Sequence, residues 1–218
     1  MNNISLILGG KSIFRGLNWE VQQEQKVGLI GPNGAGKSSL FKLITGEYTA
    51  EKGGNIIKTR GISIGYLAQE PGVDLEKNGF DVLLRGNVRL MGVREELTLL
   101  ETSMGERAVY SNPLRLTAVL ERQRILLEEY QSLGGDQYPE RVKTLLRGLG
   151  LAVGEELKPM RVLSGGQKKL IGLAQLLLNA PDVLLLDEPD NHLDLSGKVY
   201  LERLIQTYPG IVVIISHD

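Results

Sequence analysis

The chain has 218 residues, with 25 Lys or Arg and 26 Asp or Glu, so its formal net charge at pH 7 is −1. This balance gives no overall electrostatic attraction to nucleic acid or to an anionic membrane. The absence of cysteine excludes disulfides and thiolate metal sites, and 2 histidines cannot supply a multi-histidine metal centre. No apolar run approaches the roughly 18 residues that span a bilayer, and the N-terminus lacks the basic region of a signal peptide. We therefore expect a cytoplasmic protein without direct membrane insertion.

The N-terminal part of the chain is predicted to be rich in strands. Apolar runs at 4–8 and 27–30 indicate strands, and the alternation at 56–66 predicts two more short ones. A glycine-rich loop, 31–38, follows the second run, and apolar residues then recur at helical spacing over 38–44. The order strand, glycine loop, helix is that of a βα unit in a parallel α/β sheet.

The middle of the chain, 81–158, has apolar residues three to four positions apart, which predicts amphipathic helices. Its charged side chains are balanced, with 11 basic and 11 acidic between residues 85 and 158. On charge alone this favours a solvated helical subdomain over a nucleic-acid-binding face.

Sheet character returns at 183–186 and 211–215, as continuous apolar runs typical of strands covered on both faces. We therefore predict an α/β fold with a mostly parallel core sheet, an N-terminal antiparallel β part and an inserted helical subdomain. The predicted division is one domain over 1–218, with its α/β core at 1–80 and 159–218 and a helical or arm insertion at 81–158.

The glycine loop has the Walker A pattern, Gly31-x4-Gly36-Lys37-Ser38. Glycines let backbone N–H groups turn inward around phosphate oxygens, and the following helix adds the positive end of its dipole. Lys37 would neutralise the β- and γ-phosphates, and the Ser38 hydroxyl would ligate Mg²⁺. An ordinary glycine-rich turn is the alternative, but the position between strand and helix favours phosphate binding. The predicted nucleotide-binding residues are Gly31, Pro32, Asn33, Gly34, Ala35, Gly36, Lys37, Ser38 and Ser39.

A second candidate site lies at the end of the apolar run 183–186, which is followed by Asp187-Glu188-Pro189. Ligands of open α/β sheets bind at the carboxyl ends of strands, where Asp187 would emerge. An Asp in this position helps to hold Mg²⁺, and Glu188 can orient or deprotonate the attacking water. Taken alone, the pattern is also typical of a strand that ends in a solvated acidic turn. The presence of the Lys37 loop in the same chain favours the catalytic interpretation.

The third motif, at 163–167, reads Leu-Ser-Gly-Gly-Gln and precedes a helical pattern at 170–178. Ser164 and the two glycines predict a helix start with exposed amides, which is a second anion site. One domain does not need two such sites for one nucleotide. The sequence here resembles the ATP-binding cassette (ABC) family, whose signature motif is Leu-Ser-Gly-Gly-Gln.

The resemblance extends over essentially the whole chain and implies further roles. Gln69 matches the Q-loop glutamine, Asp194 the D-loop aspartate, and His217 the H-loop histidine that touches the γ-phosphate. The signature residues contact the nucleotide held by an opposite cassette. The resemblance thus implies ATP and Mg²⁺ as cofactors. The catalytic residues that it implies are Glu188, His217, Lys37 and Gln69, and the metal ligands are Ser38, Gln69 and Asp187. The signature contacts to the nucleotide would come from Ser164, Gly165, Gly166 and Gln167.

The stretch Glu188-Pro189-x-Asn191-His192-Leu193-Asp194-Leu195 is similar to the ABC-F branch, whose proteins carry two cassettes in tandem and no membrane domain. That branch also has an arm between the Q-loop and the signature. The resemblance implies a second cassette as partner, in tandem or as a homodimer, and the ribosome or its rRNA as target. Two alternatives remain open, namely the ATPase subunit of a transporter with a membrane permease as partner, and a regulatory nucleotide-binding module.

Three departures from the family pattern stand out. Asp190 replaces the usual Thr of the branch, and a third carboxylate near the phosphates should weaken nucleotide binding unless it points away. Leu8 stands where the family offers an aromatic ring to adenine. The chain stops at Asp218, before the strands and helices that complete a cassette, so we expect it to be incomplete at its C-terminus.

Overall fold

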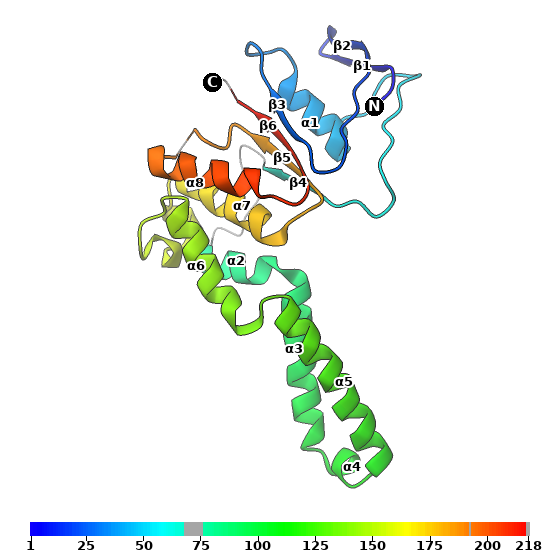
Figure 1. Cartoon of the computed structure of the whole chain (residues 1–218), viewed down its shortest axis with the longest axis vertical. Helices are drawn as coiled ribbons and strands as arrows, with labels where there is room; N and C mark the ends of the chain where they lie inside the picture. The colour runs from blue at the N-terminus through cyan, green and yellow to red at the C-terminus, as the bar shows by residue number, and fades with distance from the viewer. Residues whose placement is uncertain (68–75, 192, 217–218) are drawn as a thin grey trace.

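The computed structural model describes residues 1–67, 76–191 and 193–216 (Figure 1). It has a four-stranded parallel sheet and a two-stranded antiparallel sheet. The parallel sheet has the order β3-β6-β5-β4, with β3 at Lys26–Leu29, β6 at Ile211–Ile215, β5 at Val183–Asp187 and β4 at Ile64–Leu67. The antiparallel pair is β1 (Ile4–Leu8) with β2 (Lys11–Leu17). The predicted α/β fold with an N-terminal antiparallel part is confirmed.

One strand prediction is wrong. Of the two short strands expected within 56–66, the structure forms only β4, which begins at Ile64. The preceding segment makes a single isolated bridge, Asn55 with Asn2, and Ile57 is exposed. Alternating residues give a segment the period of a strand, but a strand also needs an edge to pair with, and β4 pairs only from Ile64 onwards.

Helices cover both faces of the parallel sheet (Figure 1). One face carries α1 (Lys37–Thr45), and the other carries α7 (Gly165–Asn179) and α8 (Leu195–Gln206). This two-sided cover explains why β6, and β5 as far as Leu186, are apolar runs rather than alternating ones.

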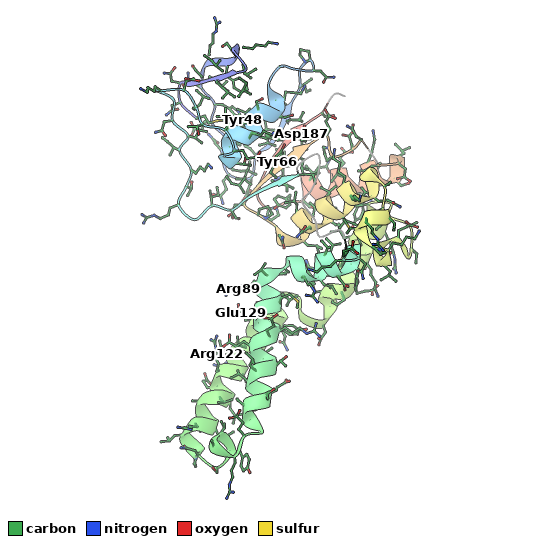
Figure 2. The ribbon with its side chains drawn as sticks, turned by 180° about the vertical axis from the view of Figure 1, so that it is seen from behind. Tyr48, Tyr66, Arg89, Arg122, Glu129 and Asp187 are labelled. Carbon is green, nitrogen blue, oxygen red and sulfur yellow. The ribbon has the colours of Figure 1, made fainter. Side chains whose placement is uncertain are left out.

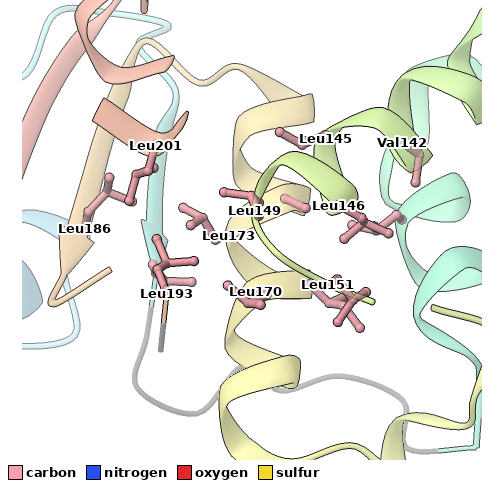
Figure 3. Close-up of a cluster of buried hydrophobic side chains, with 14 of the residues drawn as sticks. Val142, Leu145, Leu146, Leu149, Leu151, Leu170, Leu173, Leu186, Leu193 and Leu201 are labelled. Carbon is pink, nitrogen blue, oxygen red and sulfur yellow. The ribbon is translucent and has the colours of Figure 1, made fainter. Parts of the chain in front are cut away.

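Successive residues of β5 face opposite ways, as the strand geometry requires. Leu185 packs with Phe41 of α1 in one cluster, whereas Leu184 and Leu186 belong to the cluster beneath α7 and α8. Figure 3 shows Leu186 in this second cluster together with Leu173 of α7. The alternation of side chains along β5 therefore fixes which of them reach each face of the sheet.

The middle of the chain is helical, as predicted: α2 (Gly79–Gly86), α3 (Val88–Met104), α4 (Arg107–Tyr110), α5 (Pro113–Ser132) and α6 (Tyr138–Gly148). A short 3-10 turn at Gly135–Gln137 joins α5 to α6, and two more, Glu155–Leu157 and Met160–Val162, follow α6. Asparagines cap α2, α3 and α5 by accepting hydrogen bonds from amides of the first turn. The division into core and insertion at 81–158 stays a prediction. None of the helices in the described ranges has the length and apolar character needed to cross a membrane.

Helices α3 and α5 form a hairpin that projects from the rest of the molecule (Figure 1). Its small core is Val93, Leu97 and Leu126. Arg122 forms a bidentate pair with Glu96 across the two helices, at 2.7 and 2.8 Å, and Arg89 pairs with Glu129. Figure 2 labels Arg122, Arg89 and Glu129 along the hairpin. Because water screens such exposed ion pairs and leaves them little net contribution, the apolar seam holds the hairpin together.

Substitution of a buried leucine of α7 tests how strongly the packing of this helix on the sheet stabilises the protein. Leu173 is 1% exposed, and Leu173→Ala should lower the free energy of unfolding by about 2–5 kcal/mol through lost burial and a residual cavity. Leu114→Ala is the matched control, since Leu114 is 84% exposed and its loss should change stability by less than about 0.5 kcal/mol. Urea unfolding measures both, and equal effects would contradict the assignment of the core.

Candidate functional site

The loop between β3 and α1 has the conformation that its glycines predict. Gly34 and Gly36 have φ of 79° and 93°, a left-handed conformation that favours glycine. Gly36 is the N-cap of α1, and without a side chain it leaves the first amide groups of the helix open to an anion.

The antiparallel sheet packs directly behind this loop. A Cβ added at Gly36 would lie 2.5 Å from Ile13 Cγ2 and 3.0 Å from Phe14 Cζ, both side chains of β2. Gly36 is therefore required twice, by its backbone conformation and by its close contact with β2. The sequence predicted the first requirement, but no pattern indicated that β2 supports the loop.

Lys37 begins α1 and folds back over the loop. Its Nζ donates hydrogen bonds to the carbonyl oxygens of Gly31, at 2.6 Å, and Pro32, at 3.2 Å. The ammonium group thus lies within the loop, where an incoming phosphate would meet it. Ser38 and Ser39 follow in the first turn of α1 and are partly buried.

Asp187 ends β5 at the same level of the sheet as the end of β3. Both Asp187 and Leu29 are paired with Ile215 of β6, which lies between them. At about 4.8 Å per strand, the two backbones are roughly 10 Å apart. Strand parity places the Asp187 side chain with Leu185, on the face that carries α1. The structure therefore brings Asp187 and the Lys37 loop to one end of one face (Figure 2).

The Asp187 carboxylate is suited to bind a cation. It is 1% exposed, and its Oδ2 atom has no hydrogen-bond partner among the described residues. A buried carboxylate oxygen without a partner is costly unless a ligand satisfies it. Carboxylate and hydroxyl oxygens are the donors that Mg²⁺ prefers, so Asp187 and Ser38 fit the predicted ion. The third expected ligand, Gln69, lies outside the described residues.

Tyr66 is a neighbour of this carboxylate for which the sequence carried no signal. It lies on β4 beside β5 (Figure 2), and its ring meets Phe41 of α1 edge-on with centroids 5.8 Å apart. Burial, together with the charge of Asp187, raises the pKa of Tyr66 to about 12. The phenol is therefore harder to deprotonate than that of an ordinary tyrosine.

Glu188, next in the chain, has a strained backbone with φ of 49°. Its N–H donates to the Ile215 carbonyl at 3.0 Å, and its carboxylate accepts a hydrogen bond from Asn191 Nδ2. Its own carbonyl oxygen accepts a hydrogen bond from Lys169 Nζ at 2.6 Å. These contacts hold the residue that the sequence predicted to orient water.

Lys169 is a second residue that the motifs did not identify. It is only 6% exposed on α7, and burial lowers its pKa while the charges of Glu188, Asp187 and Asp190 oppose this shift. One sequence signal was available, because Lys169 is four residues before the buried Leu173 and so shares its helix face.

The extra carboxylate, Asp190, has a cationic partner. Lys198 of α8 lies 3.3 Å from its Oδ2. The negative charge expected to weaken nucleotide binding is thus partly offset within the protein. Leu8, the residue in place of the adenine-stacking aromatic, packs against the cluster of Ile4, Leu6 and Leu43.

The signature motif starts α7 with a capping box. The Ser164 hydroxyl accepts from the Gln167 amide at 3.2 Å, and Gln167 Oε1 accepts from the Ser164 amide at 2.9 Å. Because α7 covers the face opposite α1, the structure does not bring Ser164 to the Lys37 loop. The contacts predicted for Ser164, Gly165, Gly166 and Gln167 stay predictions. His192 and His217 lie outside the described residues.

Comparison with known proteins decides the family. The family described as ABC transporter matches residues 14–191. This chain belongs to it. The P-loop NTPase fold of an ABC cassette is confirmed as well: a solved structure titled "Structure of ATP binding subunit of ABC transporter" superposes with a TM-score of 0.63 at 19% identity, covering 99% of this chain and 78% of that one.

Relatives point to the ABC-F branch. The chain is 37% identical to YdiF of Bacillus subtilis (strain 168) and 32% identical to ABC transporter F family member 5 of Arabidopsis thaliana. It is 29% identical to "Ribosome protection protein VmlR" of Bacillus subtilis (strain 168). Each match covers 100% of this chain, which spans only 33%, 31% and 31% of these relatives. This cassette is therefore similar to those of ABC-F family members.

The crowding behind Gly36 gives a test of the loop. Gly36→Ala should weaken Mg-ATP binding by about tenfold or more, because a Cβ would displace β2 or the loop. Gly46→Ala is the control, since Gly46 has a similar φ of 89° but open space around it. Gly46→Ala should reduce the free energy of unfolding by about 1–2 kcal/mol and leave the affinity for Mg-ATP unchanged. Calorimetric titration measures both, and equal affinities would contradict this packing.

Proposed function

We propose that this ABC cassette binds ATP with Mg²⁺ and hydrolyses it to ADP and phosphate. The observation that supports this most is the position of the Lys37 loop and Asp187 at one end of one sheet face, where the Asp187 Oδ2 atom has no hydrogen-bond partner among the described residues. Membership of the ABC family supports ATP hydrolysis in general.

Each residue has a distinct proposed role. Lys37 and the amides at the start of α1 neutralise the phosphate oxygens, and Ser38, Asp187 and Gln69 hold the ion. Mg²⁺, when bound, neutralises charge on the phosphates. Glu188 orients a water for in-line attack on the γ-phosphorus, so that a bond forms from the water oxygen and the bond to the β-phosphate oxygen breaks. His217 contacts the γ-phosphate.

We further propose that two cassettes close on ATP as a clamp. The basis is the position of the signature helix start, on the sheet face opposite the Lys37 loop, from which Ser164 is available to a nucleotide held by a second cassette. Binding of ATP then favours the closed dimer, and hydrolysis releases it. A single cassette without its partner should hydrolyse ATP slowly.

Glu188→Gln tests the hydrolytic role. Replacing the carboxylate removes the group that orients and deprotonates water, so phosphate release should fall by about 10²-fold or more with little change in ATP affinity. Glu202→Gln on the exposed side of α8 is the control and should leave turnover unchanged. Phosphate release at saturating Mg-ATP measures both. Normal turnover in Glu188→Gln would contradict the role of Glu188.

We propose that the full-length protein acts on the ribosome, in the cytoplasm, as a translation or ribosome-protection factor. Its support is the relative named as a ribosome protection protein, and the projecting hairpin of α3 and α5 is the candidate contact.

The full-length Glu188→Gln variant, which should retain ATP, provides the test. It should sediment with ribosomes when ATP is present and not with ADP, because only ATP holds the clamp closed. Recovery with a membrane permease, and not with ribosomes, would instead establish the transporter alternative.

A further inference from the structure

Lys169 lies outside every motif from which the site was predicted, yet it contacts the site. It follows Ser164 by five positions on α7, is 6% exposed, and donates from Nζ to the Glu188 carbonyl oxygen at 2.6 Å. A buried ammonium group needs polar partners to offset its lost hydration. Here that partner is the main chain of the residue proposed to orient water.

The backbone of Glu188 has a conformation that needs contacts with its surroundings to persist. Its φ of 49° is uncommon for a residue with a Cβ, and such a conformation persists only where the surroundings hold it. The N–H is held by Ile215 of β6 and the carbonyl by Lys169 of α7. The direction of the Glu188 side chain depends on both.

The hydrogen bond from Lys169 to Glu188 is distinct from the ion pair that Asp190 makes with Lys198. Lys198 lies 3.3 Å from the Asp190 carboxylate, so the additional acidic residue has its own cation. The hydrogen bond of Lys169 goes instead to the main-chain carbonyl oxygen of Glu188, the residue that follows Asp187.

We propose that Lys169 is a positioning residue for Glu188. Its hydrogen bond to the Glu188 carbonyl fixes the strained backbone that aims the carboxylate at the attacking water. Lys169 acts through Glu188 and makes no contact with the nucleotide. This proposal rests on the proposed hydrolysis by Glu188 and adds a residue from the signature helix to that reaction.

Steady-state phosphate release and binding of a fluorescent ATP analogue, measured on the full-length protein, test this role. Lys169→Met keeps the length of the side chain but removes the donor. It should lower kcat by about 10- to 100-fold, because a small displacement of a reacting group has effects of that size. The KM for Mg-ATP and the Kd of the analogue should stay within about twofold, because the Lys37 loop is untouched.

Two further variants make the comparison specific. Lys169→Arg keeps a cationic donor and should lose less activity than Lys169→Met. Lys168→Met removes the neighbouring lysine of the same helix and should retain the wild-type kcat.

The possible outcomes separate the two proposals. Wild-type kcat in Lys169→Met, with turnover abolished in Glu188→Gln, would overturn the role of Lys169 alone. Turnover that survives Glu188→Gln would overturn the proposed role of Glu188 itself. Loss of both kcat and analogue binding in Lys169→Met and Lys169→Arg alike would show a general structural role and overturn positioning.

Discussion

The pairing of β6 with β3 on one side and β5 on the other is the constraint on which the site depends. Ile215 of β6 pairs with both Leu29 and Asp187, so the two loops that follow these strands leave the sheet at one level. A shift of one residue in the register of β5 with β6 would turn Asp187 to the opposite face, and the same shift of β3 would displace the Lys37 loop relative to it. Burial of both faces by helices prevents such a shift, because apolar side chains would then lose their clusters.

The same sheet separates the two predicted phosphate-binding helix ends. Helix α1 begins on one face and α7 on the other, so in the proposed clamp Lys37 and Ser164 of one cassette contact different nucleotides. The bond from Lys169 to the Glu188 carbonyl nevertheless ties α7 to the end of β5. A movement of the signature helix would therefore reach Glu188, the residue proposed to orient water in this cassette.

Negative charge at the site is partly offset by nearby lysines, which the overall composition of the chain does not reveal. The carboxylates of Asp187, Glu188 and Asp190 lie close in sequence, and two lysines from α7 and α8 approach them. Burial lowers the pKa of Lys169, and these carboxylates favour its charged form. A net charge of −1 gave no indication of this arrangement.

The sequence by itself determined the local features: the glycine loop, the apolar strands, the asparagine caps and the signature capping box, since each depends on residues near one another in the chain. It could not decide whether 56–62 would pair, because pairing needs a partner edge. Only the tertiary structure placed Ile13 behind Gly36, Tyr66 beside β5, and Lys169 on Glu188. These contacts join segments distant in sequence, and their geometry follows from strand order and helix packing, which no local pattern encodes.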